Sequence, residues 1–247
     1  MWIQFEHPSG PVKIDTASFH DLSIAIRKTG NVNCYYLSDP EFAYYESEAF
    51  SGSLANGGSV NCEKISLYPH ASGTHTECAL HVVPCAFDMR HAEIPLLMLC
   101  RLITADPVTD GEDRIINREA LGDLNNDKAC EALMVRTKPN TESKLHENYS
   151  GSNPPFFQPE LLSHLQNLGF RHLLTDLPSI DKESDEGRLQ AHKNWFLKYG
   201  MASPDRTITE LIYVPDSIPD GIYALSIQAP AIETDAVPSR IILYPCV

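Results

Sequence analysis

The sequence predicts a single α/β domain that is rich in β-sheet and has few helices. Three observations support this prediction: β-rich segments along the whole chain, a helix followed at once by a strand, and a length of 247 residues. A chain of this length can form one core, because single hydrophobic cores remain efficient up to about 250–300 residues. We therefore expect one domain over residues 1–247, with residues 1–19 as an N-terminal extension or arm.

Runs of alternating or continuous apolar residues predict the strands, and most of these runs are bounded by Gly, Pro, Asp or Asn. The predicted strands are, in chain order, 21–26, 60–68, 96–103, 132–137, 171–175, 207–214, 221–228 and 239–244. The residues at 40–60, 138–157 and 198–206 are typical of loops. Long loops in a compact domain often act as lids or binding loops.

Residues 159–169 predict an amphipathic helix. Pro159 suits its first turn, four leucines recur at helical spacing, and Gly169 can end the helix in the left-handed conformation. The strand predicted at 171–175 follows at once. A helix that leads directly into a strand is typical of an α/β layer.

The charge of the chain excludes some classes of partner. With 19 Lys+Arg against 33 Asp+Glu, the formal net charge is −14, so nucleic acids and anionic membrane surfaces would repel the protein. No apolar run approaches the ~20 residues that span a bilayer. The N-terminus also lacks the basic-then-apolar order of a signal peptide. We therefore expect a cytoplasmic protein that binds neither nucleic acid nor membrane and acts on a small molecule.

The seven cysteines form no C-x-x-C pair. An odd number of cysteines without a signal peptide indicates reduced thiols, which we expect to be small buried apolar groups. Cys78 is the one cysteine placed where it could be a ligand or nucleophile. As the neighbour of Glu77, however, it should point away from that carboxylate in an extended chain.

Residues 70–81 contain three histidines and a carboxylate within twelve positions. His75 and Glu77 are two apart, so in an extended chain both side chains point to one face. Glu77 and His81 are four apart, so a helical turn that starts at Glu77 would bring them together. Gly73 would allow the tight backbone path into this strand-to-helix transition. Imidazole and carboxylate are usual ligands of zinc, manganese and iron, and the alternative is a set of surface histidines beside a strand.

A second acidic and histidine-containing region lies further along the chain. Asp176 and Asp181 follow the end of a predicted strand, where α/β folds commonly build sites. His192 comes next, and Glu210 lies in a predicted strand among apolar residues. A buried carboxylate is costly unless it is paired or metal-bound, so Glu210 is either part of a site or on an exposed face of its strand.

Residues 72–81, Ser-Gly-Thr-His-Thr-Glu-Cys-Ala-Leu-His, resemble the fingerprint His-x-Gly-Thr-His-x-Asp-x-Pro-x-His of the cyclase family of metal-dependent hydrolases. The best-known members of that family are bacterial kynurenine formamidases. The likeness continues at 159–181, 191–192 and 208–210, and it spans about residues 20–244. Within the fingerprint, the first histidine falls at Ala71 with His70 one residue earlier, and the aspartate and proline are replaced by Glu and Ala.

The resemblance implies a swivelling β/β/α fold, usually oligomeric, with one or two divalent metals per chain, zinc first and manganese second. The implied metal ligands are, in chain order, His70, His75, Glu77, His192 and Glu210. The first three would hold one metal, while the last two would hold a second together with Glu77, and both glutamates would bridge the pair. His81 would then be the catalytic proton donor and acceptor.

The predicted function is hydrolysis of a small, aromatic amide or formamide by a metal-bound hydroxide, as in the kynurenine formamidases of tryptophan catabolism. Aromatic residues of the loops could line the pocket: Tyr35, Tyr36, Tyr44, Tyr45, Phe156 and Phe157. The alternatives are a single-metal enzyme for another cyclic amide or ester, a non-catalytic metal-binding relative, and a cupin-like iron oxygenase. Besides the small-molecule substrate, we expect further copies of the chain as partners, in a dimer or tetramer.

Overall fold

The computed structural model describes residues 1–8, 10–124 and 129–247. A nine-stranded sheet forms its centre, with the strand order β17-β6-β15-β12-β10-β7-β16-β18-β3. Four neighbouring strands are parallel: β15 (Thr207–Glu210), β12 (His172–Thr175), β10 (Ala132–Thr137) and β7 (Met98–Ala105). The flanking strands are antiparallel: β17 (Ala236–Pro238), β6 (His75–Glu77), β16 (Gly221–Gln228), β18 (Arg240–Pro245) and β3 (His20–Asp21).

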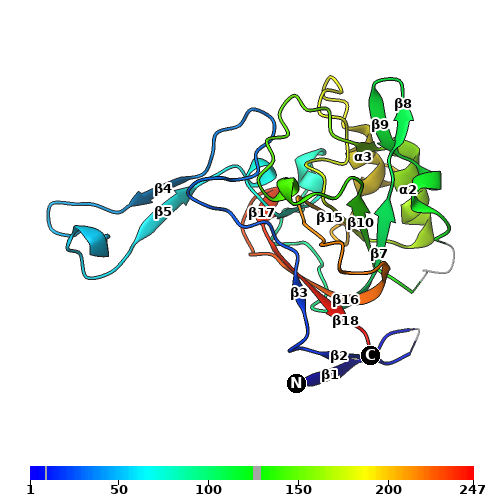
Figure 1. The fold of residues 1–247 in the computed structure, drawn as a ribbon, viewed down its shortest axis with the longest axis horizontal. Coiled ribbons are helices and arrows are strands. Elements are labelled where there is room, and N and C mark those ends of the chain that lie inside the picture. The colour runs from blue at the N-terminus through cyan, green and yellow to red at the C-terminus, as the bar shows by residue number, and fades with distance from the viewer. Residues whose placement is uncertain (9, 125–128) are drawn as a thin grey trace.

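Two helices, α2 (Pro159–Leu168) and α3 (Gln190–Phe196), lie together on one side of this sheet (Figure 1). The alternation of side chains along β10 shows how both faces of the sheet are buried. Leu133 and Val135 pack in the cluster that contains the apolar side chains of α2 and α3. Met134, between them, packs on the opposite face in the cluster that contains β16 and β18.

Smaller sheets surround this centre. They are formed by β1 (Trp2–Phe5) with β2 (Val12–Asp15), β4 (Glu41–Tyr44) with β5 (Glu63–Ser66), β8 (Val108–Asp110) with β9 (Asp113–Ile116) and β11 (Phe156–Phe157), and β13 (Leu197–Lys198) with β14 (Met201–Ala202). The remaining helices are α1 (Arg118–Leu121), η1 (Leu54–Asn56), η2 (Pro69–Ala71), η3 (Ala79–His81) and η4 (Glu142–Leu145).

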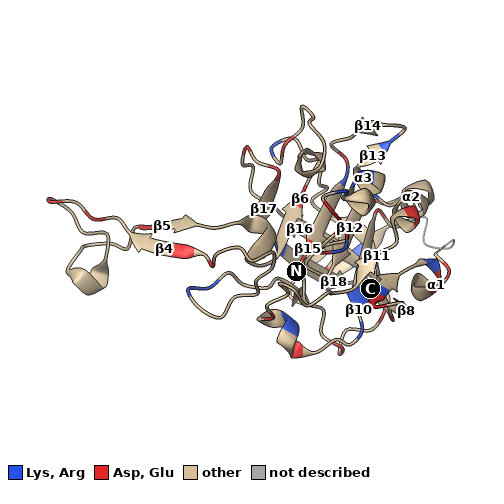
Figure 2. Ribbon diagram, turned by 90° about the horizontal axis from the view of Figure 1, so that it is seen from above, with Lys and Arg blue, Asp and Glu red and all other residues tan. Residues whose placement is uncertain are grey.

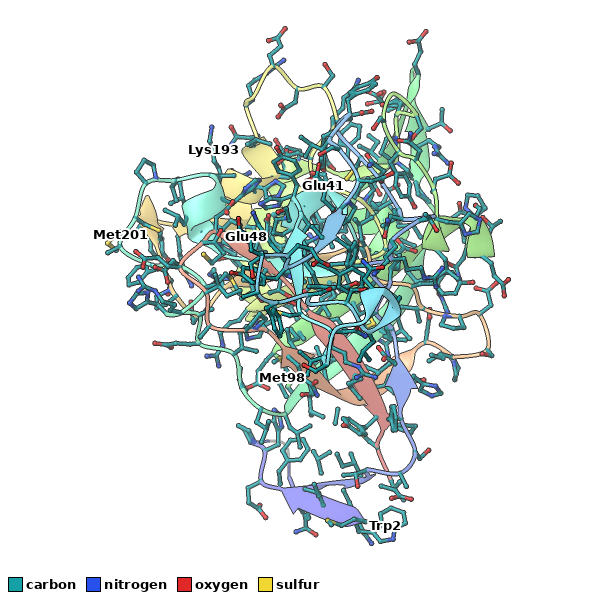
Figure 3. The ribbon with its side chains drawn as sticks, turned by 90° about the vertical axis from the view of Figure 1, so that its left-hand side faces the viewer. Trp2, Glu41, Glu48, Met98, Lys193 and Met201 are labelled. Carbon is teal, nitrogen blue, oxygen red and sulfur yellow. The ribbon has the colours of Figure 1, made fainter. Side chains whose placement is uncertain are left out.

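Two hairpins extend from the body of the protein. Figures 1 and 2 both show β4 and β5 as a long hairpin that projects away from the central sheet. In Figure 3, Trp2 on the β1–β2 hairpin lies at the opposite end of the molecule from Lys193 of α3. Among the described residues, no helix is long and apolar enough to cross a membrane.

The prediction of a sheet-rich α/β fold with few helices is confirmed, and the strands predicted at 132–137 and 221–228 coincide with β10 and β16. The predicted helix coincides with α2, which Gly169 ends at a φ of 104°. The strand predicted at 207–214 is shorter, because Leu211 turns the chain with a φ of 54° directly after Glu210. The loop prediction for 40–60 is wrong at its start, where β4 forms by pairing with β5.

Candidate metal centre

Strands β6 and β15 place three of the predicted site residues against one another. His75 and Glu77 are two apart on β6, so their side chains share one face, as the sequence predicts. The antiparallel register sets Glu210 of β15 directly opposite His75. The His75 Nε2 atom consequently lies 3.3 Å from Glu210 Oε2, and all three side chains are buried.

The chain on either side of β6 adds two histidines to the same point. Gly73 has a φ of 148°, and a Cβ there would lie 2.9 Å from the carbonyl oxygen of Ile24, so only glycine fits this turn. Before it, η2 places His70 Nδ1 3.3 Å from Glu77 Oε2. After it, η3 places His81 Nε2 3.8 Å from the same oxygen. The predicted strand-to-helix transition is therefore present, as a 3-10 turn.

Helix α3 supplies His192 from a distant part of the sequence. Its Nε2 atom lies 3.0 Å from Glu77 Oε1 and 3.7 Å from Glu210 Oε1. Its Nδ1 atom donates to Asp181 Oδ2 at 2.6 Å. The carboxylate of Asp181 also accepts the backbone N–H groups of Ala191 and His192, so it fixes both the ring and the start of the helix. The sequence pointed to the region of Asp181 but not to this supporting role.

Four buried polar atoms at this point have no hydrogen-bond partner among the described residues: His75 Nε2, His192 Nε2, and Glu77 Oε1 and Oε2. They nevertheless lie close to neighbouring donors or acceptors, as the distances above show. An unsatisfied buried polar atom costs about 1–3 kcal/mol, and native proteins seldom contain several together. A cation among these atoms would satisfy all four, since imidazole nitrogens and carboxylate oxygens are both metal ligands.

Among the described residues, three sets of side chains have ligand atoms within 4.8 Å of one another, and one of these is His70, His81 and Asp235. Another is His70, His75 and Glu77, which is the first ligand set implied by the resemblance. The third is Glu77, His81 and His192. This third set differs from the second ligand set implied by the resemblance, because it contains His81 in place of Glu210. The Oε1 atom of Glu210 accepts the backbone N–H of Ile180 at 3.0 Å. Glu77 therefore lies close to His70, His81 and His192, and Glu210 lies close to His75 and His192.

The electrostatics of the centre favour a bound positive charge. Burial raises the pKa of Glu77, but the nearby His192 and His81 outweigh it and hold that pKa well below its usual range. Burial lowers the pKa of His192, yet the carboxylates of Glu77 and Asp181 raise it well above its usual value. Without a metal, these carboxylates therefore attract protons to the histidines. A metal ion and protons should compete for the same nitrogens.

Sequence reasoning missed Asp235, which lies at the mouth of the centre. One of its oxygens, Oδ2, accepts hydrogen bonds from His70 Nε2 at 2.9 Å and from His81 Nδ1 at 3.0 Å. No histidine or acidic motif surrounds Asp235 in the sequence beyond Glu233. Only the pairing of β17 with β6 brings it to the site. Asp176, by contrast, lies outside the centre and pairs with Lys144.

A cavity of about 540 Å³ opens in front of the centre. Its lining includes His70, His81, His192 and Glu210, together with Tyr35, Leu37, Ser179, Lys182 and Leu189. Of the six aromatic residues predicted to line a pocket, Tyr35 alone is in this lining. The prediction is wrong for Phe157, which is buried in the core against the helices, and for Tyr44 and Tyr45, which lie on or next to the β4–β5 hairpin.

Cys78 points away from Glu77, as expected for its neighbour in an extended chain. Its side chain packs with Met89 and Val237, and its Sγ atom donates weakly to the carbonyl oxygen of Phe87 at 3.8 Å. Burial raises the pKa of the Cys78 thiol to about 11. The thiol is therefore protonated at neutral pH and lacks the thiolate that a nucleophile requires.

Comparison with known proteins gives one family. The model of the Cyclase family, described as "Putative cyclase", matches residues 20–182. No curated protein matches the sequence. Among solved structures, a predicted metal-dependent hydrolase from Bacillus stearothermophilus is 20% identical, with a TM-score of 0.60 over 92% of this chain and 97% of that one.

Two isatin hydrolases have a similar fold. Isatin hydrolase A from Labrenzia aggregata, bound to benzyl benzoate, is 14% identical, with a TM-score of 0.63 over 92% of this chain and 93% of that one. An isatin hydrolase bound to the product analogue thioisatinate is 12% identical, with a TM-score of 0.62 over 92% of each chain. At such identities the likeness concerns the fold alone. The mixed sheet, with four parallel strands at its centre, also argues against the cupin-like alternative.

Proposed function

Since the chain belongs to the cyclase family, we propose that it is a metal-dependent hydrolase of small amides. The observation that carries this proposal is the set of four buried nitrogen and oxygen atoms without a hydrogen-bond partner on His75, Glu77 and His192, beside a cavity that His70, His81, His192 and Glu210 line. A structural ion pair would satisfy its own atoms. A centre whose buried atoms lack such partners and which adjoins a cavity suits a metal that must also meet a substrate.

We propose zinc as the metal, with manganese second, because both accept imidazole and carboxylate ligands. His70, His75 and Glu77 would hold one ion, and His192 and Glu210, with Glu77, would hold a second where two bind. When bound, a divalent cation acts as a Lewis acid that makes hydroxide available near neutral pH and polarises a carbonyl group.

His81 is the proposed proton donor and acceptor. It lies at the mouth of the centre, lines the cavity, and turns its Nε2 atom toward Glu77. An imidazole suits this role because it can accept a proton from water through one nitrogen and return it to a leaving amine. Asp235 Oδ2 accepts a hydrogen bond from the other nitrogen of the His81 ring, Nδ1.

The cavity favours a small aromatic amide or formamide. Its volume of about 540 Å³ lies within the range of about 300–1,000 Å³ that is usual for small-molecule sites. Tyr35, Leu37 and Leu189 contribute apolar side chains to its lining. N-formylkynurenine is the first candidate substrate. Isatin, a cyclic amide, is the second, because two structures of similar fold are isatin hydrolases.

The test is metal analysis of the purified chain together with hydrolysis assays on N-formylkynurenine and isatin, with and without a chelator. We expect one or two zinc or manganese ions per chain, chelator-sensitive hydrolysis, and loss of both metal and activity in His75→Ala. The matched control is His146→Ala, which removes an exposed histidine from a loop and should change neither. Less than one metal per chain in the wild type, or full activity in His75→Ala, would contradict the proposal.

We also retain the prediction of a homo-oligomer, a dimer or tetramer. The projecting β4–β5 hairpin and its tip expose large apolar side chains, among them Tyr45, Phe50 and Leu54. Multi-angle light scattering of the full chain measures the oligomeric state, and a monomer at all concentrations would contradict the prediction.

A further inference from the structure

We propose that Asp235 is a positioning residue that fixes two histidines at once: the metal-facing nitrogen of His70 and the proton-transfer nitrogen of His81. The inference rests on the proposed function for the role of His81, whereas the role of His70 concerns metal binding alone. No motif in the sequence points to Asp235, and its role follows from where the fold places it.

The geometry centres on one oxygen atom. Asp235 Oδ2 accepts the N–H of His70 Nε2 at 2.9 Å and the N–H of His81 Nδ1 at 3.0 Å. The two rings lie almost face to face, with centroids 4.1 Å apart and planes inclined by 32°. A single carboxylate oxygen therefore joins two imidazoles that belong to different 3-10 turns, η2 and η3.

When the rings are neutral, as metal binding requires, these hydrogen bonds decide which nitrogen of each ring carries the lone pair. A neutral imidazole has one N–H and one acceptor nitrogen. Because Asp235 takes the N–H of His70 Nε2, the lone pair is on Nδ1, which lies 3.3 Å from Glu77 Oε2. Because Asp235 takes the N–H of His81 Nδ1, the lone pair is on Nε2, which lies 3.8 Å from the same oxygen. Both lone pairs thus face the metal centre.

The rest of the loop holds the carboxylate in this orientation. The hydroxyl of Thr234 donates to Asp235 Oδ1 at 3.1 Å, so the other oxygen is left to the histidines. The backbone carbonyl of Asp235 accepts the N–H of Cys78 at 3.0 Å, and that of Thr234 accepts the N–H of Met89 at 3.0 Å. Immediately afterwards, Ala236 pairs with Glu77 in the sheet. The position of Asp235 relative to Glu77 is therefore set by the sheet register.

The same carboxylate supports proton transfer. When an attacking water gives a proton to His81 Nε2, an O–H bond breaks, an N–H bond forms, and the ring becomes positively charged. Asp235, on the opposite nitrogen, stabilises that charge. The proton then passes from Nε2 to the leaving amine nitrogen, which restores the neutral ring. This division of roles is the one that the aspartate of a Ser-His-Asp triad fulfils for its histidine.

The experiment compares Asp235→Ala and Asp235→Asn with the wild type in metal affinity, in kcat and KM at saturating metal, and in the visible spectrum of the Co²⁺-substituted protein. Outer partners of metal-binding histidines typically change metal affinity or activity about 10–100-fold. For Asp235→Ala we expect a loss of that size in both affinity and kcat, a KM within about threefold of the wild type, and an altered Co²⁺ spectrum. Asp235→Asn keeps an acceptor oxygen without the charge, so it should recover metal affinity and the spectrum while kcat stays low.

The matched control is Glu233→Gln, which removes an exposed acid two residues away that pairs with Arg90. It should match the wild type in every readout, and thermal melts should confirm that all variants fold. An Asp235→Ala protein with wild-type metal affinity and spectrum would overturn the positioning of His70, whether or not a substrate has been found. Wild-type kcat in Asp235→Ala would overturn the role toward His81. If the wild type binds metal but hydrolyses nothing, the proposed function fails separately.

Discussion

Two clusters of buried charge lie along the same edge of the sheet, and they differ in how their polar atoms are satisfied. The first is Lys144 with Asp176, which follows the end of β12. The second is the metal centre, which includes Glu210 at the end of β15. In the first, Lys144 Nζ donates to Asp176 Oδ2 at 2.7 Å and to the carbonyl and hydroxyl oxygens of Thr137 at 2.7 and 3.0 Å. Thr137 in turn donates to both oxygens of Asp176.

The lysine–aspartate cluster is therefore closed: its three ammonium donors and both carboxylate oxygens have partners within the chain. The metal centre is open, because four of its buried nitrogen and oxygen atoms have no hydrogen-bond partner among the described residues. Both clusters contain a fully buried carboxylate, Asp176 in one and Glu77 in the other. Burial of charge alone thus does not identify a functional site. The atoms without hydrogen-bond partners identify it, since a closed ion pair has no free donor or acceptor for a ligand.

The largest expected effect comes from Glu77→Gln, which removes a carboxylate from the open cluster. Glu77 contacts both proposed histidine groups, so we expect the chain to lose its metal and more than about 10³-fold in kcat/KM, or roughly 4 kcal/mol of transition-state stabilisation. Metal analysis and the hydrolysis assay measure this.

The free energy of unfolding of metal-free Glu77→Gln should also fall relative to the metal-free wild type, because the histidines hold Glu77 ionised and its charge raises the pKa of His192. Retention of the metal in folded Glu77→Gln would contradict the role of Glu77 as a ligand.

The reverse result is expected for Asp176→Ala, which breaks the closed cluster and leaves Lys144 buried without its partner. Removing one partner of a buried ion pair typically costs about 3–5 kcal/mol, so the free energy of unfolding in urea should fall by that amount. Metal content per folded chain should remain that of the wild type. Asp106→Ala, at an exposed position, is the control. Loss of metal in Asp176→Ala at temperatures where it is folded would contradict the separation of the two clusters.

The sequence predicts those parts of the fold in which local pattern and final environment agree. Strands 132–137 and 221–228 are apolar because the sheet buries them, and the leucine spacing of α2 matches the face it packs on the sheet. It does not predict β4, whose Glu-Phe-Ala-Tyr sequence is mostly exposed and becomes a strand through pairing with β5. Exposed strands of this kind depend on a pairing partner that is distant in the sequence, and a local pattern does not show that partner.

The same limit applies to the metal centre. His75, Glu77 and His81 are recognisable because their spacing of two and four fits a strand followed by a turn. His192 and Glu210 lie in a second candidate region of the sequence, but their role as ligands of the same centre followed only from the resemblance to a family. Asp235 lies 154 positions from His81, and only the β17–β6 pairing joins them. Asp176 and Asp181 are both aspartates and lie five residues apart, yet they belong to different clusters. This distinction requires the three-dimensional positions of Lys144 and His192.

A smaller effect should come from Asp181→Asn, which weakens the support of the open cluster without removing a ligand. Asp181 Oδ2 accepts the Nδ1–H of His192, which fixes the nitrogen turned toward Glu77. Loss of such a carboxylate typically lowers metal affinity about 10–100-fold. Asparagine keeps an acceptor oxygen for the start of α3, so the fold should persist. Competition with a chelator measures the affinity, and wild-type affinity in this variant would show that His192 does not need Asp181.

The smallest effect concerns His172, at the opposite end of β12 from Asp176. Its ring is buried and hydrogen-bonded to the hydroxyl of Thr207 at 2.9 Å. Burial first, and then the charge of Arg171, lower its pKa to about 4 from 6.5. Because the folded pKa is depressed, the neutral ring stabilises the fold fully above pH 6.5, and this contribution is lost as the pH falls from 6.5 toward 4.

His172→Asn keeps a polar group near the hydroxyl of Thr207 but cannot titrate. Between pH 7.5 and 5.5, the free energy of unfolding of the wild type should therefore fall by about 1 kcal/mol more than that of the variant. Urea titrations at the two pH values give this difference, and every other titrating group, including those of both clusters, contributes equally to wild type and variant. An equal fall in both proteins would show that His172 is protonated as readily in the fold as in the unfolded chain. The buried ring of His172 would then carry a positive charge without a charged partner. This result would contradict the contrast between the two clusters, in which every buried charge needs a partner or a bound ion.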